Sequence, residues 1–185
     1  MSIEQQRQDE IDKYVKVYAE AEHYGSHGDL LRGMIQTVLS GLPGDSLVDL
    51  SCGRGAAMEI ADQYFETVCG TETVPELLGP RVKFAMAHDL PFGDKSFDVV
   101  MSTGVLEHLL PADTYPALTE MKRVAKRAVF ITLNNKPGHF HINCPSYAGW
   151  NAIFQEVFEP WSIAYLGDMG NGGENRAWLI VAGTG

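Results

Sequence analysis

The sequence lacks most features of a secreted, membrane-bound or disulfide-stabilised protein. Only three of its 185 residues are cysteines, an odd number at wide spacing that offers neither a disulfide framework nor a Cys-x-x-Cys metal motif. No apolar run approaches the length that spans a bilayer, and residues 1–10 are polar without the apolar core of a secretory signal. These absences favour a soluble protein of the cytoplasm, with no membrane partner.

Basic residues are also scarce. Fourteen Lys and Arg stand against 24 Asp and Glu, which gives a formal net charge of -10. Because each phosphate contact normally needs a Lys or Arg, this balance disfavours a nucleic-acid partner. Basic residues cluster at 122–127, at the end of a helical pattern, where cations favourably meet the carbonyl end of the helix dipole. We therefore interpret this cluster as a solvated helix end.

What the sequence does contain is an alternation of short apolar strands with helical patterns. Apolar residues recur at helical spacing over 11–18 and again over 30–38. Seven strand-like runs follow, at Ser46–Leu50, Thr67–Thr71, Val82–Ala85, Phe97–Ser102, Ala128–Leu133, Trp161–Leu166 and Arg176–Ala182. Helical patterns separate most of the first five, which favours a parallel sheet covered on both faces.

The last two runs differ, because the Gly- and Asn-rich residues 167–175 between them leave no room for a helix. They should therefore pair antiparallel. We expect an α/β fold that is Rossmann-like and doubly wound, with a mostly parallel seven-stranded sheet and a C-terminal antiparallel hairpin. A chain of this length is expected to form a single domain over 1–185, with two leading helices in 1–40.

Residues Leu47–Gly55, reading Leu-Val-Asp-Leu-Ser-Cys-Gly-Arg-Gly, connect the first strand to a helix through a turn of small residues. Gly53 and Gly55 have no Cβ, so backbone can approach a ligand closely, and the N–H groups of the helix start can point at an anion. Asp49 adds a negative charge beneath the turn. Glu72 follows at about the twenty-residue spacing at which carboxylates hold ribose hydroxyls in βαβ nucleotide sites. The set predicts a pocket for an adenosine with a charged tail.

A second segment, residues 88–109, reads His-Asp-Leu-Pro-Phe-Gly-Asp-Lys-Ser-Phe-Asp-Val-Val-Met-Ser-Thr-Gly-Val-Leu-Glu-His-Leu. Together with the glycine turn, it resembles the class I S-adenosylmethionine-dependent methyltransferases, in particular their small-molecule, methyltransferase type 11-like branch. The resemblance runs through residues 46–133 in the family's order. It implies S-adenosylmethionine as cofactor and a fold whose closing strands form an antiparallel hairpin.

The resemblance also implies which residues contact the cofactor. Those placed around its methionine part are Asp49, Ser51, Gly53 and Gly55, with Glu72 on the ribose hydroxyls. Asp89 would accept a hydrogen bond from the adenine amino group while Leu90 packs on the ring, and Thr103 and Val105 would lie near the sulfonium. Glu72 could instead begin the next helix, and Asp89 could simply form a turn before a proline.

Three histidines follow the fourth and fifth predicted strands. Glu107-His108 matches a common pair of the family at a helix expected to begin at Val105, and we assign it no catalytic role. His139 and His141 leave the fifth strand at the ligand edge, and either could deprotonate the methyl acceptor because histidine titrates near neutral pH. They could equally be loop residues bonded to backbone. Their spacing to Cys144 fits no zinc signature, so we expect no metal.

Methyl transfer from a sulfonium is an in-line displacement that depends mainly on holding donor and acceptor in line. The sequence therefore predicts a methyltransferase acting on an oxygen or nitrogen of a small molecule. Three alternatives stay open: a cofactor-binding sensor without catalysis, a nicotinamide oxidoreductase, and a methyltransferase acting on a nucleotide or nucleic-acid base. Residues 1–40 resemble the segment that in related enzymes folds over the cofactor as a lid, with Tyr24 singled out. Oligomeric state is left undecided.

Overall fold

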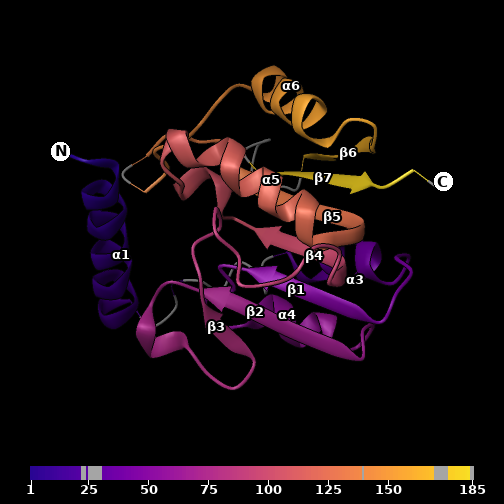
Figure 1. Ribbon diagram of the computed structural model, residues 1–185, viewed down its shortest axis with the longest axis horizontal. Coiled ribbons are helices and arrows are strands. Elements are labelled where there is room, and N and C mark those ends of the chain that lie inside the picture. Colours follow the sequence, from indigo (N-terminus) through magenta and orange to yellow (C-terminus); the bar gives the residue numbers. More distant parts are fainter. Residues whose placement is uncertain (22–23, 25–30, 139, 169–174, 184–185) are drawn as a thin grey trace.

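The computed structural model describes residues 1–21, 24, 31–138, 140–168 and 175–183. Seven strands form one sheet in the order β3-β2-β1-β4-β5-β7-β6 (Figure 1). Their bounds are β1 Ser46–Leu50, β2 Thr67–Glu72, β3 Val82–Phe84, β4 Phe97–Thr103, β5 Ala125–Asn134, β6 Ser162–Asp168 and β7 Asn175–Val181. The first five strands pair in parallel, and β7 runs antiparallel to both β5 and β6. The predicted fold class and closing hairpin are confirmed.

Five α-helices and three short 3-10 helices lie in the described part of the chain. Their bounds are α1 Ile3–Glu20, α3 Arg32–Leu39, α4 Ala56–Ala61, α5 Thr114–Val124, α6 Tyr147–Phe158, η1 Pro75–Leu77, η2 Leu106–His108 and η3 Pro111–Asp113. None of these described helices combines the length and apolar character needed to cross a bilayer.

The prediction that a helix begins at Val105 is wrong. Only the single 3-10 turn η2 forms there, and the main helix α5 begins at Thr114. Leu110 is extended, with φ -57° and ψ 137°, because it precedes Pro111 and a residue before proline is kept out of the helical region. The helix ends at Val124, inside the basic cluster of residues 122–127, so Lys126 and Arg127 belong to β5.

Strand residues alternate between two apolar cores, one on each face of the sheet. Leu47, Val99 and Phe130 lie in the core that includes buried residues of α3 and α4. Val48, Val100 and Ile131 lie in the core that includes buried residues of α5 and α6. This two-residue period follows from strand geometry and gives the doubly wound arrangement seen in Figure 1.

Helix α1 stands apart from these layers, beside the edge where β1, β2 and β4 end (Figure 1). None of its residues is buried. The Arg7 guanidinium pairs with the Asp113 carboxylate at 2.5 Å, and the Tyr14 hydroxyl lies 2.8 Å from Nδ1 of His108. Arg54 donates a 3.0 Å hydrogen bond to the Tyr18 carbonyl oxygen. Side-chain contacts therefore hold α1 over the strand ends.

Candidate active site

The turn between β1 and α4 has an unusual backbone. Ser51, Gly53 and Gly55 all adopt left-handed conformations, with φ of 50°, 55° and 84°. Such angles favour glycine, and a serine there is uncommon. Neighbouring β2 fastens the turn, because the Cys52 N–H donates to the Thr71 carbonyl oxygen at 2.9 Å. In this turn, backbone atoms rather than side chains therefore lie at the ends of the strands.

A cavity lies between this turn and α1. Five of the predicted cofactor residues line it: Ser51, Gly53, Glu72, Thr103 and Val105. The remaining lining residues are Arg7, Glu10, Ile11, Tyr14, Tyr18, Tyr24, Cys52, Ala57, Thr73, Met86, Ala87, His88, Gly104, His108, Leu109, Leu110 and Asp113. Residues separated by more than a hundred positions therefore meet around one space at the carboxyl edge of the sheet, the place where ligands bind in such folds.

Glu72 ends β2 at the wall of the cavity and is only 4 % exposed. One carboxylate oxygen, Oε2, accepts from the Gly53 N–H at 2.9 Å, and the other accepts from the Thr73 N–H at 2.6 Å. The carboxylate therefore ties the glycine turn to the end of β2. Oε1 also accepts from the Val74 N–H and the Thr73 hydroxyl, each at 3.3 Å, whereas Oε2 has Gly53 as its one donor among the described residues. A carboxylate oxygen can accept two hydrogen bonds, so Oε2 can accept a ribose hydroxyl as well.

Asp49 lies one layer deeper, on β1 beneath the turn. Its side chain is fully buried, and neither carboxylate oxygen has a hydrogen-bond partner among the residues the structure describes. Burial, followed by the charge of Glu72, raises the pKa of this carboxyl well above its usual range. An unsatisfied buried carboxylate is costly, and a cationic ligand group near the turn would compensate for it. Gly55 is outside the cavity wall and lines a separate shallow pocket.

Asp89 and Leu90 were predicted to contact the adenine, and this stays a prediction. Asp89 is exposed, Leu90 is buried in the core, and neither lines the cavity. The Asp89 N–H donates to the Met86 carbonyl oxygen at 3.0 Å and closes a tight turn. Because of this turn, the preceding residues, Met86, Ala87 and His88, reach the cavity in place of Asp89. The sequence around Pro91 indicated a turn but not which of its side chains point inward.

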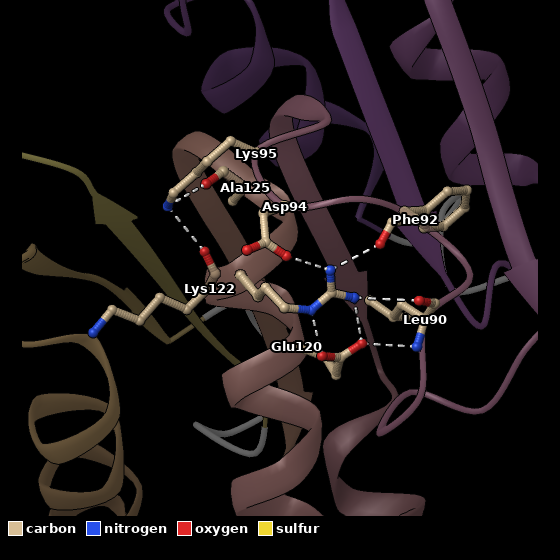
Figure 2. A network of polar contacts seen from close by, with 8 residues as sticks. Leu90, Phe92, Asp94, Lys95, Glu120, Lys122 and Ala125 are labelled. Atoms are coloured by element: carbon tan, nitrogen blue, oxygen red, sulfur yellow. Dashed lines mark hydrogen bonds and ion pairs between the residues drawn. The ribbon is translucent and has the colours of Figure 1, made fainter.

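A polar network holds this loop against α5 (Figure 2). The Arg123 guanidinium donates to the carboxylates of Glu120 and Asp94 and to the carbonyl oxygens of Leu90 and Phe92. Glu120 in turn accepts from the Leu90 N–H at 2.8 Å. Arg123 therefore has a structural role, and the interpretation of its basic cluster as a solvated helix end is wrong for this residue.

The opposite wall of the cavity is aromatic. The ring of Tyr24 lies 6.1 Å from that of Tyr14, 5.2 Å from that of Tyr18 and 5.9 Å from that of Phe140. Burial is the main cause that raises the pKa of all three tyrosines, so their hydroxyls stay protonated. The sequence singled out Tyr24 and placed Tyr18 in the same predicted lid segment, whereas Tyr14 was taken only as an apolar position of a helix.

Of the two histidines proposed as bases, His139 lies outside the described residues. Nδ1 of His141 lies 2.7 Å from the Lys136 carbonyl oxygen, and its ring centre is 4.8 Å from that of His108. His141 does not line the cavity, whereas His108 does. The histidines that line the cavity in the described part of the chain are therefore His88 and His108, to which the sequence assigned no role.

A family model described as a methyltransferase domain matches residues 48–132, the segment that carries β1 to β5 and the glycine turn. These residues form a methyltransferase domain, and the chain is similar to the class I S-adenosylmethionine-dependent methyltransferases. It is 34 % identical over 92 residues to an uncharacterised methyltransferase of Synechocystis, covering 45 % of this chain and 43 % of the relative. It is 30 % identical over 150 residues to an O-methyltransferase of Penicillium expansum, covering 72 % and 52 %. The chain thus spans about half the length of these curated relatives.

Among solved structures, the chain resembles the Burkholderia thailandensis 1,6-didemethyltoxoflavin-N1-methyltransferase, crystallised with its substrate and S-adenosylhomocysteine. The TM-score is 0.75 at 14 % identity, over 98 % of this chain and 91 % of that one. At this level of identity the comparison shows a shared fold. The shared fold includes the sheet edge at which the cavity described above lies.

Proposed function

We propose that this chain binds S-adenosylmethionine and transfers its methyl group to an oxygen or nitrogen atom of a small molecule. The observation that carries the proposal is the meeting of the left-handed turn, Glu72 and the unsatisfied Asp49 at one cavity edge. The methyltransferase domain of the chain supports it, as do the names of its relatives, which include an O-methyltransferase and an N1-methyltransferase. A cytoplasmic location fits the cysteine usage.

The residues present fit this cofactor. The turn at Ser51–Gly55 would receive the methionine part, and the Asp49 carboxylate would offset the charge of its ammonium group. Glu72 would accept the ribose hydroxyls, and Met86 and Ala87 would meet the adenine in the place first expected for Asp89 and Leu90. When bound, S-adenosylmethionine supplies a methyl group on a positively charged sulfur.

The aromatic wall fits the acceptor side of such a reaction. Tyr14, Tyr18 and Tyr24 exclude water and present flat apolar faces, with protonated hydroxyls for hydrogen bonding. Positioning of this kind supplies most of the acceleration of an in-line transfer. Where the acceptor must lose a proton, His88 and His108 are the described histidines that line the cavity, and we propose α1 with Tyr24 as the cover of the site.

Calorimetric titration with S-adenosylmethionine and S-adenosylhomocysteine tests the proposal. Wild-type protein should bind both, and Glu72→Ala should weaken binding by about tenfold to a hundredfold, because hydrogen bonds to a charged group are worth about 1.5–3 kcal/mol. Glu66→Ala is the matched control, since Glu66 is exposed and directly precedes β2. The proposal would be overturned if wild-type protein gave no heat with S-adenosylmethionine or with S-adenosylhomocysteine. It would also be overturned if Glu72→Ala and Glu66→Ala bound these ligands with equal affinity.

A cofactor-binding sensor without catalysis is the second candidate, because His141, one of the two histidines predicted as bases, does not line the cavity. Incubation of the protein with a metabolite extract and methyl-labelled cofactor separates the two. Transfer of label into any small product excludes a purely binding role. Retained binding without transfer across extracts of several growth conditions would favour the sensor.

A further inference from the structure

Three potential metal ligands converge behind the aromatic wall. One donor atom from each of Glu107, His108 and His141 lies within 4.8 Å of the other two. Glu107 and His108 belong to η2 after β4, whereas His141 lies in the loop after β5. Glu107 and His141 are outside the cavity lining, and His108, which lines the cavity, is not among the proposed cofactor contacts. Two imidazoles and a carboxylate form a donor set that Zn²⁺ accepts.

The Glu107 carboxylate is incompletely satisfied. Glu107 is only 1 % exposed. Its Oε1 accepts a hydrogen bond from the Asn134 N–H at 2.7 Å. The other oxygen, Oε2, is buried and has no hydrogen-bond partner in the described part of the chain. Leaving a buried oxygen unpaired is costly, and a cation between the carboxylate and the imidazoles would remove that cost.

Both histidines are oriented from behind by backbone carbonyls. Nδ1 of His108 lies 2.9 Å from the Phe140 carbonyl oxygen, and Nδ1 of His141 lies 2.7 Å from that of Lys136. A carbonyl only accepts, so Nδ1 carries the proton in each ring and Nε2 carries the lone pair. Metal-binding histidines are typically held in this way, with the second ring nitrogen donating to a carbonyl or carboxylate.

We propose that Glu107, His108 and His141 bind one divalent transition-metal ion, with Zn²⁺ as the best match. Ligands at tetrahedral zinc stand about 3.4 Å apart, given bond lengths of about 2.0–2.1 Å. The cluster would therefore contract on binding, and His141 can move because its loop carries no helix or strand. The ion would leave one position for water. It would also fix His108, whose Nδ1 meets the Tyr14 hydroxyl of α1 at 2.8 Å.

The proposal does not depend on methyl transfer, and its test uses no nucleoside. The full chain is stripped with a chelator and titrated with Zn²⁺ by calorimetry, and with Co²⁺ by visible absorption. We expect one ion per chain and the ligand-field bands of a four-coordinate Co²⁺ site. His141→Ala should weaken Zn²⁺ binding by about a hundredfold or more. His88→Ala is the control, because His88 is a half-buried histidine outside the cluster, and it should bind Zn²⁺ like wild type.

Two results would overturn the proposal. One is no saturable Zn²⁺ binding by folded wild-type protein, and the other is equal affinity of wild type and His141→Ala. Glu107→Gln adds a second measurement, with circular dichroism to confirm its fold, and should also weaken binding. His141 lies in a loop and has no part in the core, so its variant tests the site even if the Glu107 variant does not fold.

Discussion

Asp49 and Asp98 are buried acids with opposite surroundings. Asp98 Oδ2 accepts from the N–H groups of Asp45 and Ser46 and from the Ser46 hydroxyl, while Arg127 donates to Oδ1 at 3.2 Å. Although burial acts to raise it, these hydrogen bonds lower the pKa of Asp98 to about 2. Asp49 lacks such donors among the described residues, and burial raises its pKa. One carboxylate therefore stabilises the fold, whereas the other is placed at a cost.

Asp98→Asn should destabilise the protein by about 2 kcal/mol at neutral pH, because the pKa of Asp98 is about 2 in the folded protein and about 4 in the unfolded chain. Because the folded pKa is lowered, the contribution is complete above the unfolded pKa of about 4 and is lost as pH falls toward 2. Urea unfolding of both proteins between pH 7 and pH 2 measures this. A stability difference that stays constant across this range would contradict the assignment.

Asp49→Asn should have the opposite pH dependence. The folded pKa of Asp49 is raised, so the wild type loses stability as pH rises above the unfolded value of about 4. The variant should therefore be more stable than wild type at pH 7 and equal to it near pH 3. Thermal unfolding at both values tests this. Calorimetry on the same samples should show weaker S-adenosylhomocysteine binding, and a variant less stable at pH 7 would refute the idea.

At the scale of elements, α1 is the helix with the weakest attachment. It contributes no buried residue, and Arg7, Tyr14 and Tyr18 carry its described polar contacts to the rest of the molecule. Helices held by few apolar contacts open locally at low free energy. In the proposed role of α1 as a cover, such opening without unfolding of the sheet would allow cofactor and product to exchange.

Tyr14→Phe should therefore lower the free energy of local opening of α1, with little effect on the stability of the whole protein. Loss of the hydroxyl contact to His108 removes about 1 kcal/mol, which corresponds to roughly fivefold faster amide exchange in residues 3–20. Native-state hydrogen exchange measures it, and the melting temperature should change little. Lys16→Ala is the control on the same helix, because its only described ion pair, at 4.0 Å to Glu20, is exposed. Equal exchange in both variants would contradict this account of α1.

The sequence predicted the elements of the sheet better than the details of its loops. Strands were recognisable because apolar runs such as Ser46–Leu50 sit between turn residues, and each of the seven lies within three residues of its predicted bounds at either end. The sequence around Pro91 indicated a turn, but not that Met86, Ala87 and His88 line the cavity, because side-chain direction in a tight turn depends on backbone geometry that the sequence does not show. The grouping of Glu107 with His141 was also hidden, since 33 residues of intervening chain must fold first.

At the scale of the whole molecule, binding of the cofactor product should increase the free energy of unfolding. With S-adenosylhomocysteine at a hundred times its dissociation constant, the folded state gains about 2.7 kcal/mol. For a chain of this size the melting temperature should rise by roughly 5–10 °C. Glu72→Ala should shift less at the same concentration. NADH should give no shift, and a shift with NADH instead of S-adenosylhomocysteine would favour the oxidoreductase alternative.

Strand β7 follows every other strand along the chain, yet it lies between β5 and β6 in the sheet. During synthesis on the ribosome, β5 must wait with one edge unpaired until residues 175–181 have emerged. An open strand edge is a template for wrong pairing with other chains. Final closure of the sheet therefore follows translation of this strand, and nascent chains stalled before it are the species that chaperones must protect.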